Sequence, residues 1–225
     1  MKTKILFILI IILFVSICQA EDSVALTLKA KGKVELTRGE ENSDINTGDE
    51  LYNKDEIESM EDSFAAFKFI DGSSVVKLFP NSILTINAKK EGDKLDKKSY
   101  LKMGELWSKV VKKTGVFEVE TPTTVVSVKG TEILVSHSNE KGTTLFTFSG
   151  DAEIKNKRDG KTAMVGANQK ANLTPDGQIE VSGIKKGDID EGIQQMMEDE
   201  ESSENIEIEL KNDSGEKKTI TIEFE

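Results

Sequence analysis

Residues 120–135 read Glu-Thr-Pro-Thr-Thr-Val-Val-Ser-Val-Lys-Gly-Thr-Glu-Ile-Leu-Val, and they decide the fold class of this chain. Pro122 has no backbone N–H for a sheet ladder, so it is predicted at the start of the strand formed by the β-branched run that follows. Gly130 separates this run from a second apolar run, which indicates a bulge, a tight corner or a close approach of another backbone. The segment holds no catalytic group, and it points to a β-rich binding or signalling module.

Similar short runs lie on both sides of this segment. Each is rich in Val, Ile, Thr or Phe, and they cover residues 24–30, 33–37, 63–70, 74–79, 83–87, 116–120, 123–128, 132–137 and 143–148. Clusters of turn formers, such as Asp71-Gly72-Ser73 and Arg158-Asp159-Gly160, separate or follow them. This pattern predicts a mainly β fold over residues 21–184, either a β-sandwich or a β-roll/β-helix-like domain of short strands. No amphipathic helix alternates with the runs, which excludes a doubly wound α/β fold.

The β region contains an internal echo. Gly32 begins a strand-like run and Gly48 follows it, and Gly150 and Gly166 repeat this arrangement at the same spacing. The echo indicates two similar hairpin units that bracket a central set of strands, or successive coils of one roll. Coincidence among glycine-punctuated strands is the third interpretation.

The N-terminus resembles a secretory signal peptide over residues 1–20. Lys2 and Lys4 precede the apolar run Ile5–Cys18, and Ala20 offers a cleavage site. The run is short for a spanning helix, so an uncleaved anchor in the inner membrane is the alternative. Lipidation of Cys18 is disfavoured because bulky Ile17 precedes it. Cleavage would remove the single cysteine, and export without disulfides predicts a bacterial periplasmic protein with no stable membrane span after cleavage.

Charge and residue inventory exclude several function classes. The chain has 41 acidic and 30 basic residues, a net charge of −11, which disfavours nucleic-acid binding. The single histidine, His137, shares strand parity with apolar neighbours, and a satisfied structural role is expected. We predict no cofactor and no metal. Residues 188–199 imitate a calcium loop only loosely, because Ile193 stands where that loop needs glycine.

Trp107 is the only tryptophan, and it lies in a locally basic segment. Its ring could stack on a sugar or on a side chain of a partner. The alternative is a buried or rim aromatic residue, because tryptophan is large and mostly buried.

Composition changes after Ile184, and the C-terminal part is predicted as two further units. Residues 185–205 form an acidic helix and linker, with Asp188–Glu201 as a short amphipathic helix. Residues 206–225 form a β-hairpin around the turn 212–215. Its apolar face, the candidate partner contact, comprises Ile206, Ile208, Leu210, Ile220, Ile222 and Phe224. A two-stranded ribbon is marginal alone, so this face should cover the main domain by default, or else a copy of itself or a partner.

The 120–135 segment resembles the Thr-Pro…Val-Arg-Gly-Thr signature of the FecR-type periplasmic domain family. The matching residues are Thr121, Pro122, Lys129, which replaces the usual arginine, Gly130 and Thr131. The resemblance covers residues 36–135 and, more loosely, continues to 183. Its further parts are 48–51, 71–78, 81–86 and 104–106.

The resemblance implies a β-rich domain in the periplasm. In the best-known members of the family this domain senses a loaded outer-membrane transporter and signals through a membrane helix to a cytoplasmic sigma factor. Here only Met1–Lys4 precede the apolar run, so direct control of a sigma factor is not expected to carry over. What the resemblance implies for this chain is a periplasmic, non-enzymatic β module.

Three hypotheses follow. The first is a non-enzymatic exported protein that acts in the cell envelope as a protein-interaction or signal-sensing module. The second is a periplasmic module that binds glycan or peptidoglycan through Trp107. The third is a carboxylate-based hydrolase, which would need acids converging in one cleft. The expected partner is an envelope protein or a cell-wall polymer.

Overall fold

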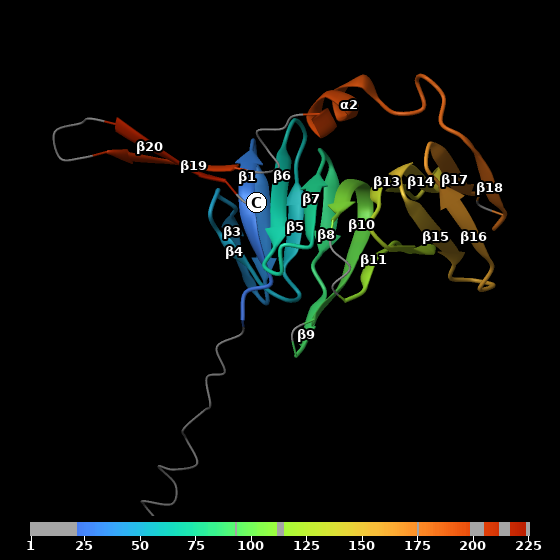
Figure 1. The fold of residues 1–225 in the computed structure, drawn as a ribbon, viewed down its shortest axis with the longest axis horizontal. Helices are drawn as coiled ribbons and strands as arrows, with labels where there is room; N and C mark the ends of the chain where they lie inside the picture. Colours follow the sequence, from blue (N-terminus) through green and yellow to red (C-terminus); the bar gives the residue numbers. More distant parts are fainter. Residues whose placement is uncertain are drawn as a thin grey trace, which may run out of the picture.

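The computed structural model describes residues 22–92, 94–111, 115–174 and 176–198, and the backbone of two further strands at 205–211 and 217–223. The predicted signal peptide, the hairpin turn and Phe224 lie outside the described residues. The described chain is mainly β, with one short helix, so the predicted fold class is confirmed. Figure 1 shows strands stacked side by side along the body, with the helix above them.

The strands of the body form two layers. The first layer contains β1 (Ala25–Lys31), β4 (Glu50–Leu51), β6 (Phe64–Phe69), β7 (Ser74–Leu78), β13 (Glu132–Ser138), β14 (Gly142–Ser149), β17 (Gln169–Leu173) and β18 (Ile179–Gly183). The second layer contains β2 (Val34–Arg38), β3 (Glu41–Asp44), β5 (Glu56–Ser59), β8 (Ser82–Thr85), β9 (Ala88–Glu91), β11 (Phe117–Glu120), β12 (Thr124–Val128), β15 (Asp151–Asn156) and β16 (Thr162–Gly166). Of the pairs between described strands, all are antiparallel except β10–β11.

The long strand β10 (Lys94–Val110) belongs to both layers. Its first half pairs with β8, β9 and β11, and its second half pairs with β7 and β13. Gly104 lies where the strand changes layer, at a φ of +96°, and a Cβ there would collide with Ser82. Because only glycine tolerates both constraints, Gly104 permits one strand to join the two sheets.

Glycines also make the corners where the chain crosses between layers. Gly32 links β1 to β2, Gly130 links β12 to β13, and Gly150 links β14 to β15, with φ values of +75°, +71° and +73°. Gly130 and Gly150 approach each other, since a Cβ on Gly150 would lie 2.6 Å from the carbonyl oxygen of Gly130. Gly130 is therefore a tight corner with another backbone close to it.

The corners explain the internal echo. The segments after Gly32 and Gly150 form the hairpins β2–β3 and β15–β16. Both hairpins belong to the second layer, and β3 and β16 are its two outermost strands. This arrangement agrees with the bracketing interpretation.

The main core lies between the two layers. Alternate residues of each strand enter it, for example Val126 and Val128 from β12 and Ile133 and Val135 from β13. Burying a side chain of this size stabilises the fold by about 1.5–3 kcal/mol.

The outer face of the first layer is also apolar, and a strap of residues 184–198 covers it. The face comprises Leu28, Phe64, Ala66, Phe79, Trp107, Leu134 and Phe146. The strap contains helix α2 (Glu191–Glu198) and contributes Ile189 and Ile193 to the cluster. Oδ1 of Asp190 accepts from the backbone N–H of Gly192 and Ile193, at 2.8 and 3.3 Å, and so caps the start of the helix.

Two lysines hold the strap. Nζ of Lys77, which is 1% exposed, donates to the carbonyl oxygens of Met196 and Met197 at the end of α2, at 3.3 and 2.9 Å. Lys170 on β17 forms an ion pair of 2.6 Å with Asp188. Among the helices of the described residues, none has the length and apolarity needed to cross a membrane.

The C-terminal strands β19 (Asn205–Lys211) and β20 (Lys217–Glu223) form a separate two-stranded sheet. β19 approaches β1, and the pair extends away from that end of the body (Figure 1). The register places Ile206 opposite Ile222 and Ile208 opposite Ile220. Cross-strand pairs share a face, so these four positions lie on one face of the ribbon.

Candidate functional site

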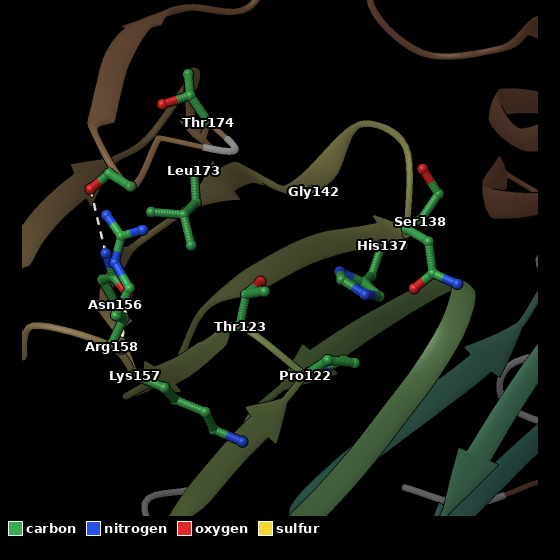
Figure 2. Close-up of a pocket in the computed structure, with 12 residues that line it drawn as sticks. Pro122, Thr123, His137, Ser138, Gly142, Asn156, Lys157, Arg158, Leu173 and Thr174 are labelled. Carbon is green, nitrogen blue, oxygen red and sulfur yellow. Dashed lines mark hydrogen bonds between the residues drawn. The ribbon is translucent and has the colours of Figure 1, made fainter.

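A pocket of about 500 Å³ opens at one end of the two-layered body. Its walls come from the β11–β12 turn, the β13–β14 hairpin, the segment after β15 and the segment after β17. In Figure 2, Arg158 and Asn156 lie on one side, His137 and Ser138 on the other, and Thr123 and Leu173 between them. Segments far apart in the sequence therefore meet at this pocket.

The Thr-Pro step forms the turn between β11 and β12. The N–H of Thr121 donates to the carbonyl of Thr124 at 2.9 Å. Oγ1 of Thr121 accepts from the N–H of Thr123 and Thr124, at 3.3 and 3.0 Å. Pro122 suits the second position of such a turn because its ring fixes φ. The turn exposes Pro122 and Thr123 toward the pocket and buries Thr121.

A chain of hydroxyl groups joins this turn to the opposite wall. Oγ1 of Thr143 lies 3.0 Å from Oγ1 of Thr121, 3.1 Å from Oγ1 of Thr123 and 2.9 Å from Nδ1 of His137. Thr121 and Thr143 are both fully buried. Buried hydroxyls need partners, and these residues supply them to one another.

His137 is 3% exposed and lines the pocket. Its Nε2 has no hydrogen-bond partner among the described residues, so the expected satisfied histidine is satisfied at Nδ1 only. Burial lowers the pKa of His137 below its usual 6.5, against a smaller opposing effect of the Gly142 backbone. The imidazole is therefore neutral at pH 7.

Two cations line the far side of the pocket. Nζ of Lys157 donates to Glu120 at 2.7 Å and to the carbonyl of Thr121 at 2.8 Å. Nη2 of Arg158 donates to the carbonyl of Asp176, and its backbone N–H donates to Oδ1 of Asn156 at 2.8 Å.

The neighbouring loop also positions Arg158. Asn156 donates to the carbonyl of Gly177 at 3.1 Å (Figure 2). A Cβ on Gly177 would collide with the Arg158 guanidinium, so the absence of a side chain there leaves room for it.

The structure divides the motif residues between two places. Thr121 and Pro122 belong to the pocket end. Lys129, Gly130 and Thr131 lie at the other end of β12, at the corner to β13. Lys129 is exposed, and buried Thr131 donates to the carbonyl of Asp151 at 2.9 Å. The Gly-Thr half of the motif thus has a structural role.

Trp107 lies beneath the strap. It is 5% exposed, its Nε1 donates to Glu132 at 3.2 Å, and Nζ of Lys77 lies 5.1 Å from its ring centroid. In this arrangement the ring belongs to the outer apolar cluster and presents no open face for stacking.

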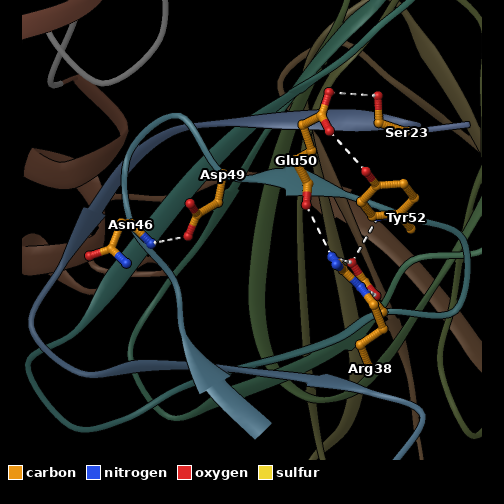
Figure 3. Close-up of polar contacts among 7 residues, drawn as sticks. Ser23, Arg38, Asn46, Asp49, Glu50 and Tyr52 are labelled. Carbon is orange, nitrogen blue, oxygen red and sulfur yellow. Dashed lines mark hydrogen bonds and ion pairs between the residues drawn. The ribbon is translucent and has the colours of Figure 1, made fainter. Parts of the chain in front are cut away.

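Figure 3 shows a second polar cluster, which includes Arg38, Glu50 and Tyr52. Nε and Nη2 of Arg38 donate to the two carboxylate oxygens of buried Asp55, at 2.8 and 2.7 Å. Asp55 also accepts from the N–H of Tyr52 at 2.8 Å, and the hydrogen bond from Tyr52 to Glu50 raises the pKa of that tyrosine. The guanidinium lies 4.3 Å from the Tyr52 ring centroid. These groups satisfy one another, so the cluster ties β2 to the β4–β5 segment.

The acids of the described residues do not gather into a metal site. No group of three or more His, Cys, Asp or Glu side chains within that part of the chain is arranged to hold a metal ion.

Comparisons with known proteins give one family. The family described as "FecR protein" matches residues 55–153. No curated protein matches the chain. Two crystal structures of a protein from Parabacteroides distasonis ATCC 8503, provisionally described as an anti-sigma factor, are similar to it at 18% sequence identity and a TM-score of 0.49.

For both structures, the match covers 57% of this chain and 59% of theirs. The chain thus spans less than two thirds of their length. The family match includes the whole 120–135 segment and the residues Thr143 and His137 of the pocket. The resemblance expected from the sequence is therefore confirmed over residues 55–153, where the family model matches.

Proposed function

We propose that this chain is an exported, non-enzymatic protein that acts in the bacterial cell envelope as a protein-interaction or signal-sensing module. The match of residues 55–153 to the family described as "FecR protein" supports this proposal, because that resemblance implies a β-rich module in the periplasm. The predicted signal peptide supports export to the periplasm.

The observation that carries the proposal is the C-terminal hairpin. β19 and β20 pair only with each other among the described strands. A two-stranded ribbon is marginally stable alone in water, so a surface that packs on it would stabilise it. The register gathers four isoleucine positions on one face, which suits docking on an apolar surface of an envelope protein.

The test is affinity purification from solubilised envelopes of the producing bacterium. The double variant Ile208→Ser, Ile220→Ser changes one cross-strand pair of the apolar face. The matched control, Glu207→Gln with Thr221→Ser, changes the neighbouring pair on the other face. We expect the wild type and the control to recover one and the same envelope protein. The apolar-face variant should recover at least about tenfold less of it, since truncating an interface anchor costs about 2 kcal/mol or more.

Two measurements make the outcome decisive. Circular dichroism should show unchanged folding of the body in both variants, because the hairpin is a separate sheet. Recovery that is equal for the two double variants would contradict the proposed contact. Mass spectrometry of the exported protein should find Glu21 at its N-terminus, and a protein found only in the cytosol would contradict the proposal as a whole.

A further inference from the structure

We propose that the pocket beside the Thr-Pro turn binds a small ligand that carries one carboxylate on a sugar-sized polar body. This site goes beyond the proposed partner contact. The pocket lies near β15 and β17, and the hairpin extends from the opposite end of the body beside β1 (Figure 1). Either proposal can therefore fail without the other.

The charge of the pocket is unusual for this protein. Acidic residues outnumber basic ones by 41 to 30 in the whole chain, yet the pocket lining contains two cations and no acid. Glu120 neutralises one of these cations, Lys157, at 2.7 Å. Arg158 forms no ion pair with a carboxylate among the described residues. The pocket thus offers one positive charge that a ligand can neutralise.

The Arg158 guanidinium is also held in place. The Asp176 carbonyl accepts from its Nη2, and the Gly177 backbone packs against it. Asn156 fixes the backbone of Arg158 and, through Gly177, the loop that faces it. A preorganised group loses little entropy on binding. The planar fork of a guanidinium matches the two oxygens of a carboxylate.

The charge count favours a carboxylate over a phosphate. A carboxylate carries one negative charge, which one unpaired guanidinium balances. A phosphate monoester carries a charge of about −1.5 to −2 at pH 7 and would need a second unpaired cation. Lys157 could supply this second positive charge only by breaking its ion pair with Glu120.

The rest of the pocket suits a small polar body. Its volume of about 500 Å³ lies within the roughly 300–1,000 Å³ of small-molecule sites. Hydroxyl and amide groups of Thr123, Ser138, Asn139 and Thr174 stand around an apolar patch made by Pro122 and Leu173. His137 adds a buried Nε2 without a partner among the described residues, and a ligand that supplies a hydrogen bond there gains affinity.

The test is an NMR titration of the protein purified from cells that express the full chain. The probes are glucuronate, glucose and inorganic phosphate. Glucuronate and glucose share a ring and differ in the carboxylate. We expect saturable shifts with glucuronate at the backbone amides of Thr123, Gly142 and Arg158, and no saturable shifts with glucose.

Variants that remove one positive charge inside or just outside the pocket show whether glucuronate binding depends on Arg158. Arg158→Gln should weaken glucuronate binding about tenfold or more, and Arg158→Lys should give an intermediate affinity because it keeps the charge and loses the fork. Lys161→Gln removes the same charge just outside the pocket and should leave binding within about twofold, because its exposed charge is screened. Thermal unfolding checks that each variant folds.

Four results would overturn the proposal. They are absence of a saturable shift with glucuronate, equal binding of glucose, tighter binding of phosphate than of glucuronate, and equal losses in Arg158→Gln and Lys161→Gln.

Discussion

Oγ1 of Thr121 lies 3.0 Å from Oγ1 of Thr143, and this contact joins the Thr-Pro turn to the wall of the pocket. The next link is the 2.9 Å contact between Thr143 and Nδ1 of His137. All three side chains are buried. The threonine of the motif therefore supports the geometry of the pocket as well as the turn itself.

Replacing Thr143 with valine should destabilise the fold by about 2 kcal/mol, because it leaves the buried Nδ1 of His137 without its hydrogen-bond partner and removes one contact of Thr121 Oγ1. Because valine keeps the shape of the threonine side chain, the change in the free energy of unfolding measures the contribution of the hydroxyl group. Chemical denaturation measures it. The control is Thr144→Val on the other face of β14, where the hydroxyl bonds half-buried Asn172 at 3.2 Å. We expect a cost below about 1 kcal/mol there. Equal costs at the two positions would contradict the special role of the Thr143 hydroxyl in joining Thr121 to His137.

His137 should make stability fall as the pH is lowered. Its pKa in the folded protein is depressed below 6.5, so the unfolded chain binds the proton first as the pH falls. The contribution of neutral His137 to the free energy of unfolding is fully present above pH 6.5. It is lost as the pH falls from 6.5 toward the pKa of His137 in the folded protein. Denaturation midpoints across this window measure the slope.

The variant His137→Asn isolates that contribution, because His137 is the only histidine. Burial raises the pKa of Glu105, which acts in the opposite direction, since a folded carboxyl with a raised pKa gains stability on acidification. Subtracting the variant's profile removes this effect. A wild type and variant with the same profile between pH 6.5 and 5 would show that His137 is not responsible.

The local pattern predicted the strands around the motif well. Runs at 116–120, 123–128, 132–137 and 143–148 correspond to β11, β12, β13 and β14. These strands are short runs rich in Val, Ile, Thr or Phe, and turn formers or glycine separate several of them, so the local sequence is enough to mark them.

The long strand β10 was harder to predict because a buried position in its first half holds Lys97. This lysine is 1% exposed, and it is paired with Asp71 at 2.6 Å and bonded to Ser73 at 2.8 Å. A lysine at a core-facing position hides the alternation of apolar residues, and only the pairing partner from the β6–β7 turn explains its burial.

The pocket could not be predicted from the sequence for a similar reason. The Arg158-Asp159-Gly160 turn and the Thr-Pro step were each identified, but their meeting depends on how strands from two layers pair. The ladder β12–β15 brings Thr124 opposite Asn156 and so sets the Thr-Pro turn beside Arg158. Such non-local pairing has no signature in either segment.

The corner at Gly150 predicts a difference between two alanine substitutions. Gly150 and Gly160 have φ values of +73° and +74°, so alanine meets the same backbone strain at both. A Cβ at Gly160 has open space, whereas one at Gly150 meets the Gly130 carbonyl at 2.6 Å. We expect Gly160→Ala to cost about 1 kcal/mol and Gly150→Ala about 3 kcal/mol. Thermal unfolding of the two variants checks this, and equal costs would contradict the close approach of the two corners.

Lys77 should control how tightly the strap covers Trp107. Replacing it with methionine keeps the length of the side chain but removes the donors to the carbonyls of Met196 and Met197. Hydrogen bonds to charged groups contribute about 1.5–3 kcal/mol, so the strap should detach more often, even though removing a buried charge offsets part of the loss. Because Trp107 is the only tryptophan, its fluorescence should shift to longer wavelength as its cover loosens.

Hydrogen exchange at residues 191–198 should increase in parallel, while exchange in the ladder between β12 and β15, which lies in the other layer, stays unchanged. The control Lys89→Met removes a lysine whose side chain is 77% exposed, and it should alter neither signal. An unchanged emission spectrum together with unchanged exchange in Lys77→Met would mean that the apolar contacts of Ile189 and Ile193 hold the strap without the lysine.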